Sequence, residues 1–165
     1  MTDVIIEQLK QFLTGHMAHK NFEDAISDFP MSKINTKLDN IPYTFWHLLE
    51  HIRRGQKDIY EYISSSDYKS MNWPDDYWPP RNKEATAEDW NKTINEIRDL
   101  YEQSKALIEN KSLAELSKKI EFVDKDHSVL RGIILIIDHN AFHMGQFVTM
   151  RMVLGSPSVN KNSPV

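Results

Sequence analysis

The chain has 165 residues, a length that suits one domain with a continuous hydrophobic core. Hydrophobic residues make up 40% and charged residues 27% of it, which excludes an intrinsically disordered chain. The net charge of -4 at pH 7, without any basic run, argues against nucleic acid or an anionic membrane as a partner.

The sequence contains no cysteine, which limits both its chemistry and its expected location. Disulfides, thiolate zinc sites and a cysteine nucleophile are excluded, so a metal site must use histidine, aspartate or glutamate. The acidic N-terminus does not resemble a signal peptide, and the most apolar stretch, residues 133–137, is too short to span a membrane. We therefore expect a cytoplasmic protein.

Helical periodicity begins at the N-terminus. The apolar spacing from Ile5 to Leu13 follows one face of a helix, and Thr2 is a suitable N-cap for it. A short second helix is predicted over residues 21–28, where a proline follows, and residues 31–42 are expected to form a connector.

A long helix is predicted from Thr44 to Ser64, followed by an unusual segment over residues 67–85. This segment holds Trp73, Trp78 and three prolines, a composition that fits neither a helix nor a flexible linker. Long ordered loops in compact domains are often functional, but aromatic residues of a loop also cap the ends of cores. The sequence leaves both interpretations open.

A third helix is predicted to open at Thr86, and a fourth to run from about Asp126 to Leu154, where Gly155 ends it. No segment shows the alternation of a strand. Four long amphipathic helices predict an all-α four-helix bundle, whose functional sites lie between facing helices. We expect residues 1–155 to form one domain and residues 156–165 a disordered tail.

The pair His139 and His143 is the first candidate for a functional site. Positions i and i+4 project from one side of a helix, so both imidazoles can reach the same ion. The same face carries Ile136 and Phe147, and histidines in an apolar stripe are explained if a metal satisfies their nitrogen atoms. Gln146 is placed to line the same pocket. The alternative is a pair of hydrogen-bonded core histidines.

A second histidine pair lies on the predicted helix 44–64, as His47-Leu48-Leu49-Glu50-His51. This is the spacing of inverted zinc metalloproteases, in which the glutamate is the general base. The helical wheel disfavours that interpretation, because it turns His47 and Glu50 toward solvent and leaves only His51 at the margin of the core. A protease would also need a second domain for its substrate cleft.

The predicted metal ligands are therefore His51, His139 and His143. Three imidazoles leave an open coordination position, as in catalytic rather than structural sites. Asp58 and Glu50 are the first candidates for a proton acceptor, and Asp58 is also placed to orient a ligand.

The other histidines and one arginine have simpler expected roles. His16, His19 and His127 have no partner at ligand spacing. Arg151 points away from the predicted site on the helical wheel, so we expect it to form a salt bridge.

Three segments resemble DinB-like proteins. Residues 45–59 look like the second helix of that family, residues 73–79 resemble the loop of one branch, and residues 138–146 with Arg151 and Gly155 resemble the last helix. The segments occur in the family's order and span most of the chain.

The resemblance implies an up-down-down-up helical bundle with a three-histidine site for zinc, nickel or a similar divalent ion. By position the ligands carry over to His51, His139 and His143, with His47 as an additional histidine one turn earlier. Members are often homodimers that act on small molecules. Some transfer a low-molecular-weight thiol to electrophiles, and many are assigned as metal-dependent hydrolases. The competing hypothesis is a non-catalytic bundle dimer whose metal site is vestigial or stabilising.

Overall fold

The structure is a computed structural model that describes residues 4–15 and 18–157. Thr2, His16 and residues 158–165 of the expected tail lie outside the described residues. Within the described part the chain folds into six α-helices and two 3-10 turns, without a strand. The predicted all-α class is therefore confirmed.

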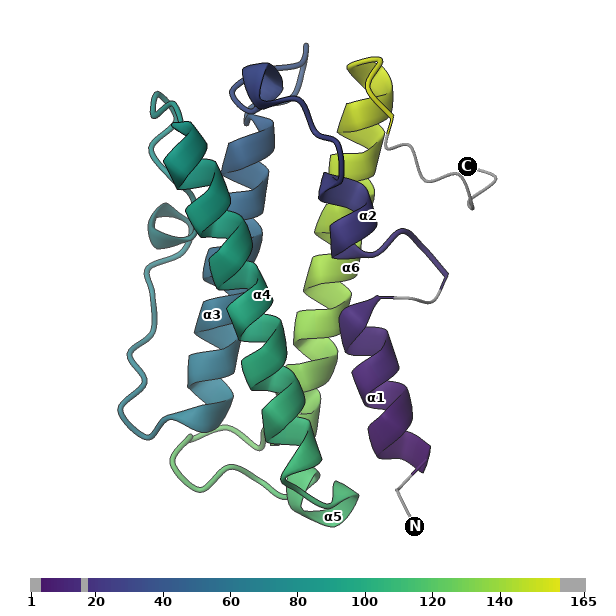
Figure 1. Cartoon of the computed structure of the whole chain (residues 1–165). Coiled ribbons are helices and arrows are strands. Elements are labelled where there is room, and N and C mark those ends of the chain that lie inside the picture. The colour runs from purple at the N-terminus through teal and green to yellow at the C-terminus, as the bar shows by residue number, and fades with distance from the viewer. Residues whose placement is uncertain (1–3, 16–17, 158–165) are drawn as a thin grey trace.

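Four long helices make up the bundle: α1 (Val4–Thr14), α3 (Phe45–Ser64), α4 (Ala87–Glu109) and α6 (Val129–Val153). In Figure 1, α3 and α4 begin at the top of the view, whereas α1 and α6 begin at the bottom. The most extensive helix contact is between α3 and α6, and α4 lies against α3 and α1.

The short elements occupy the connections. They are α2 (Phe22–Ile26), η1 (Met31–Lys33), η2 (Asp75–Tyr77) and α5 (Leu113–Leu116). The element η2 is a single 3-10 turn inside the proline-rich loop 67–85, which runs along α3 before the chain enters α4. The prolines there prevent a longer helix.

Hydroxyl side chains fix where the long helices begin. The helices α3 and α4 begin where the sequence predicted, and the side chains of Thr44 and Thr86 each accept a hydrogen bond from the third residue of the helix. The last helix begins at Val129 and not near Asp126, because the Ser128 side chain accepts from the backbone N–H of Arg131.

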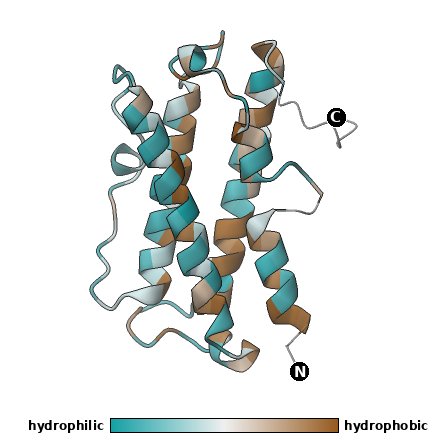
Figure 2. Cartoon of the chain, in the orientation of Figure 1, coloured by the Kyte–Doolittle hydropathy of each residue, from teal (hydrophilic) through white to brown (hydrophobic). Residues whose placement is uncertain are grey.

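The apolar sides of the helices form two hydrophobic clusters, one in each half of the bundle. Phe29, Phe45 and Phe147 pack ring against ring in the upper half, beside α2. Ile63 and Ile133 belong to the cluster of the lower half. Figure 2 shows hydrophobic and hydrophilic residues alternating along the long helices. Across the described residues, every helix is too short or too polar to cross a bilayer.

Among the residues that the structure describes, Arg151 has no partner for the salt bridge predicted for it. Its guanidinium is buried and donates to the carbonyl oxygens of Ala25, Ser27 and Ser156, at 2.6–2.8 Å. The sequence could not reveal these acceptors, because they are backbone atoms of distant segments. The side chain ties α2 and the end of α6 together.

The fold predicts opposite effects for two glycines of α6. A Cβ on Gly132 would overlap Cγ2 of Ile63, whose β-branched side chain has little freedom to move. We expect Gly132→Ala to lower the free energy of unfolding by about 1–3 kcal/mol in denaturant titrations. A Cβ on Gly145 would meet nothing within 4 Å. Gly145→Ala should therefore raise the free energy of unfolding by ~0.5–1 kcal/mol, because alanine favours a helix over glycine. Equal effects of the two substitutions would contradict the packing described for α3 and α6.

Candidate metal site

The packing of α3 against α6 brings three histidines to one point. His51 comes from α3, and His139 and His143 come from successive turns of α6. One ring nitrogen of each lies within 4.8 Å of the others. The three residues predicted from the sequence to share a site are therefore adjacent in space.

The His51 ring is held on two sides by the loop 67–85. Its Nδ1 lies 3.0 Å from the carbonyl oxygen of Tyr77, and a carbonyl only accepts, so Nδ1 carries the proton. The ring of Trp78 stacks on the imidazole at 3.9 Å between centroids and 3° between planes. These contacts fix the tautomer and the plane of the ring, leaving the Nε2 lone pair directed into the cluster.

The two histidines of α6 are held in a similar way by side-chain amides. Nδ1 of His143 donates to Oε1 of Gln146 at 2.7 Å, and Nδ1 of His139 donates to Oδ1 of Asn140 at 3.2 Å. Asn140 in turn donates to Gln56 at 3.0 Å and to the Tyr101 hydroxyl at 3.2 Å. Such outer contacts orient metal-binding histidines and fix their tautomers.

Burial keeps the three imidazoles neutral at pH 7. His51 and His143 are 3% and 9% exposed, and loss of solvent lowers the pKa of each to about 4. Burial also lowers the pKa of His139. A metal ion binds the neutral form of imidazole, so protons do not compete for these nitrogens near neutral pH.

The spacing of the nitrogens fits a metal ion. Nε2 of His51 lies 3.1 Å from Nε2 of His143. With both Nδ1 atoms protonated and both rings neutral, two lone pairs face each other without a proton between them. Two nitrogens at about 2.0–2.1 Å from one zinc ion are separated by about 2.9–3.4 Å, depending on the coordination geometry. A cation between the rings would therefore satisfy both nitrogens.

Gly55 makes room for this arrangement, a role that the sequence reasoning missed. A Cβ at this position would lie 2.7 Å from Cε1 and 2.9 Å from Nε2 of His139. Such approaches are closer than van der Waals contact allows, so any larger residue would displace the ring. A glycine in the middle of a helix was the available signal, because it costs stability unless close packing requires it.

His47 does not point toward solvent as the helical wheel predicted. It is 3% exposed, its Nδ1 lies 2.6 Å from the Thr44 hydroxyl, and its Nε2 donates to the Pro80 carbonyl at 3.1 Å. The wheel considered only the bundle, whereas residues of the proline-rich loop cover this side of α3. His47 caps the helix and anchors the loop, and it lies outside the cluster of three histidines.

Glu50 is also buried, at 7% exposed, and not turned toward solvent. Its carboxylate forms ion pairs with Arg53 at 2.7 Å and Arg54 at 2.9 Å, and it accepts from the Thr93 hydroxyl at 3.1 Å. Burial alone would raise the pKa of Glu50, but the two guanidinium groups outweigh it and the net pKa is lowered. A carboxylate held in this way is a poor proton acceptor.

Asp58 is linked to the cluster through the loop. Its two oxygens accept from the hydroxyls of Tyr68 at 2.8 Å and Tyr77 at 2.7 Å. Burial and the carboxylate raise the pKa of both tyrosines, which remain protonated donors. Because the Tyr77 carbonyl accepts from His51, Asp58 fixes the segment that orients this histidine. The loop is thus part of the site, and of the two interpretations that the sequence left open for Trp78, its stacking on His51 favours the functional one.

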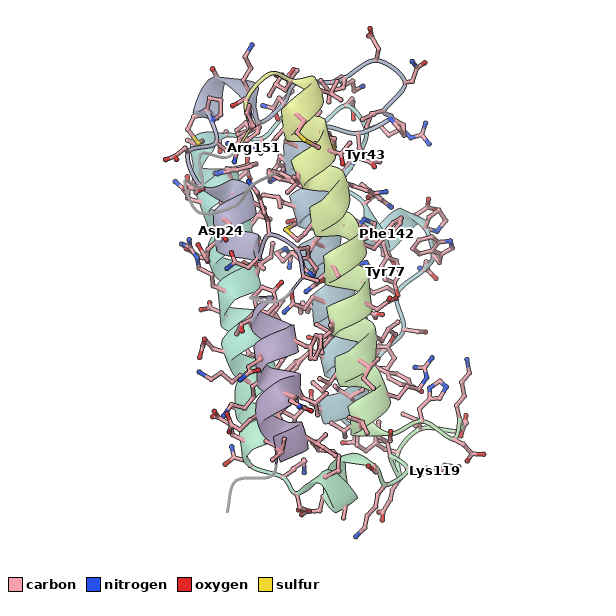
Figure 3. All side chains as sticks on the ribbon, turned by 90° about the vertical axis from the view of Figure 1, so that its right-hand side faces the viewer. Asp24, Tyr43, Tyr77, Lys119, Phe142 and Arg151 are labelled. Carbon is pink, nitrogen blue, oxygen red and sulfur yellow. The ribbon has the colours of Figure 1, made fainter. Side chains whose placement is uncertain are left out.

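Aromatic side chains lie at the surface of the molecule near the three histidines. Figure 3 places Tyr77 and Phe142 on the same side of the molecule. Trp73 and Phe142 are both largely exposed there. The surface beside the histidine cluster is therefore rich in aromatic side chains.

Comparisons with known proteins identify the family. A model of the DinB superfamily matches residues 15–147. A search of curated proteins found no match, and neither did a search of solved structures. The matched segment covers most of the chain and includes all three clustered histidines, so the chain belongs to the DinB superfamily.

Proposed function

We propose that this protein is a metal-dependent enzyme that holds one divalent transition-metal ion, zinc or nickel, on His51, His139 and His143. The observation that carries the proposal is the tautomer of these rings. Each Nδ1 donates to an oxygen of the protein, so three Nε2 lone pairs remain for one ion. Their burial keeps them neutral and available.

Three protein ligands support a catalytic rather than a structural site, because one coordination position remains for a substrate. When bound, a divalent ion supplies Lewis-acid chemistry and lowers the pKa of a water or thiol that it coordinates. The protein's own part is to hold the three imidazoles in fixed planes and to keep solvent from His51 with the Trp78 ring.

The surrounding carboxylates favour a thiol substrate over hydrolysis. Hydrolysis profits from a general base that accepts the proton of water. The two candidates are engaged elsewhere, Glu50 with two arginines and Asp58 with two tyrosine hydroxyls. A thiol has a pKa of about 8.5 and releases its proton to solvent with less assistance. We therefore propose transfer of a low-molecular-weight thiol to an electrophile, with hydrolysis as the alternative activity.

The helix directions in Figure 1 support the up-down-down-up topology that the family resemblance implies. The homodimer, the small-molecule substrate and the cytoplasmic location stay predictions. A non-catalytic dimer with a stabilising ion is the competing proposal, and the activity test below separates the two.

Metal binding distinguishes the two histidines of α3. Protein freed of metal with a chelator should bind one zinc ion per chain in a calorimetric titration, and His51→Ala should weaken this binding at least about 100-fold. His47→Ala should retain the stoichiometry and the affinity, although loss of its two hydrogen bonds lowers stability by ~1–3 kcal/mol. The reverse pattern would place the ion one turn earlier on α3.

The close approach of Gly55 gives a second test of the ligand set. In Gly55→Ala the new Cβ would push the His139 ring away from its position, so the zinc affinity should fall at least about tenfold. Gly145→Ala, a helix glycine with open space around it, is the matched control and should bind zinc as the unmodified protein does. Unchanged affinity in Gly55→Ala would argue against His139 as a ligand.

The activity itself is tested with the metal-loaded protein, a simple thiol such as cysteine, and 1-chloro-2,4-dinitrobenzene. In this reaction a carbon–sulfur bond forms, the carbon–chlorine bond breaks, chloride leaves and the thiol proton goes to solvent. We expect a rate above the uncatalysed one that falls at least about 100-fold in His139→Ala.

Two controls decide between the activities. Hydrolysis of p-nitrophenyl acetate by the loaded protein, without thiol transfer, would favour the hydrolase. Absence of both activities across a panel of thiols, with zinc bound, would favour the non-catalytic dimer.

A further inference from the structure

A separate apolar pocket lies beside the histidine cluster, at the start of α3. It has a volume of about 270 Å³. Its lining comes from residues just before and within the first turn of α3 and from the end of the proline-rich loop: Pro42, Tyr43, His47, Trp78, Pro79 and Arg81. A pocket of this size, mostly apolar with few polar groups, is suited to a small organic molecule.

The walls of the pocket are flat. Tyr43 and Trp78 stack at 5.1 Å between centroids and 27° between planes, and two prolines complete the apolar surface. Aromatic walls of this kind favour a planar ligand, which can stack on or against the rings. Trp78 also stacks on His51, so the pocket and the histidine cluster share one side chain.

The charge around the pocket is positive and uncompensated. In the part of the chain that the structure describes, Arg81 has neither an ion pair nor a hydrogen-bond partner for its side chain. Burial is the main cause of the lowered pKa of His47, and the positive charge of nearby Lys37 lowers this pKa further. The first turn of α3 carries no acidic residue, so the positive end of this 20-residue helix is not neutralised.

The Tyr43 hydroxyl adds an available donor. Partial burial raises the pKa of this phenol, which therefore keeps its proton. Among the described residues no hydrogen-bond acceptor is recorded for it. Figure 3 shows Tyr43 on the same side of the molecule as Tyr77 and Phe142.

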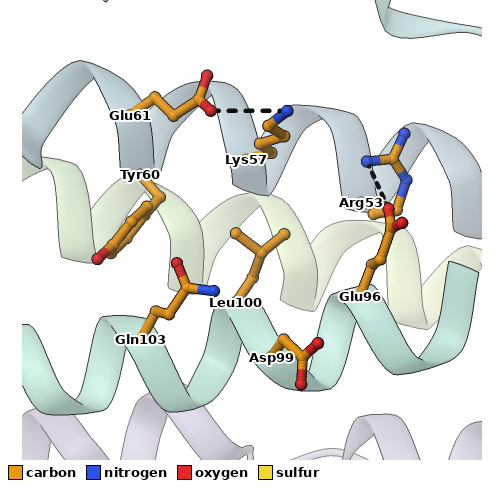
Figure 4. A pocket seen from close by; sticks show the side chains of 8 residues that line it. All are labelled: Arg53, Lys57, Tyr60, Glu61, Glu96, Asp99, Leu100 and Gln103. Carbon is orange, nitrogen blue, oxygen red and sulfur yellow. Dashed lines mark ion pairs between the residues drawn. The ribbon is translucent and has the colours of Figure 1, made fainter. Parts of the chain in front are cut away.

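A groove farther along α3 differs in the pairing of its charges. Figure 4 shows the groove between α3 and α4, where Arg53 pairs with Glu96 at 3.0 Å and Lys57 pairs with Glu61 at 3.6 Å. Both cations of this groove are paired with glutamates, and its lining also holds the carboxylate of Asp99. The pocket at the start of α3 instead combines apolar walls with Arg81, which has no partner among the described residues.

We propose that this pocket binds a planar apolar small molecule that carries one anionic group, with Arg81 and the Tyr43 hydroxyl as donors to the anion. The ring system of the ligand packs against Tyr43, Trp78 and the prolines. A guanidinium beside apolar walls is well suited to a carboxylate, because it donates two parallel hydrogen bonds. The site does not depend on the proposed metal ion, since none of the three clustered histidines lines it.

The test uses two probes of the same shape and different charge, 1-naphthoate and 1-naphthamide. Each is titrated by calorimetry into the full chain after treatment with a chelator. We expect one naphthoate per chain, bound about tenfold more tightly than the amide, as one charge-assisted contact provides. Arg81→Gln should remove this difference without weakening the amide, and Tyr43→Ala should weaken both probes.

Arg131→Gln is the matched control, because it removes the same charge from an exposed position near the start of α6, at the other end of the bundle. It should leave the affinities of both probes unchanged. The proposal is overturned if naphthoate does not bind, if acid and amide bind equally, or if Arg131→Gln acts as strongly as Arg81→Gln. Unchanged binding in Tyr43→Ala would likewise place the probes elsewhere. Because the protein is free of metal, the result is independent of the proposed enzymatic function.

Discussion

The contact between α3 and α6 at Gly55 is the constraint on which the site depends. The missing side chain lets the His139 ring approach the α3 backbone, and the same contact brings His51 within reach of His143. A four-helix bundle ordinarily fills the space between facing helices with apolar side chains. Here that space holds three imidazoles whose outer nitrogens are all occupied, and this makes a metal ion the natural partner of the inner ones.

The proline-rich loop holds His51 in place and is itself held against α3. Its Tyr77 carbonyl and Trp78 ring hold His51, while Asp58 and His47 hold the loop to α3. The loop therefore acts as a second wall of the site. Trp78 both stacks on His51 and lines the apolar pocket. A ligand bound at the histidine cluster or in the pocket would therefore contact or lie next to the same side chain.

Periodicity and local helix-start signals were sufficient to predict the helical class, the starts of α3 and α4, and the three clustered histidines. Each of these depends on local spacing, which helix geometry converts directly into a shared face. The errors concern His47, Glu50 and Arg151, whose burial depends on a loop or on backbone carbonyls far away in the sequence. A helical wheel describes only the helix it is drawn for, so it cannot show that a loop covers the outer side.

The central claim is that three neutral imidazoles, and no carboxylate, hold the ion. X-ray absorption of the nickel-loaded or zinc-loaded protein measures this directly, because imidazole rings give a characteristic multiple-scattering pattern. The account predicts three imidazole nitrogens at about 2.0–2.1 Å, with a remaining light atom from solvent or substrate. A first shell with fewer than three imidazoles, or one completed by a carboxylate of the protein, would contradict it.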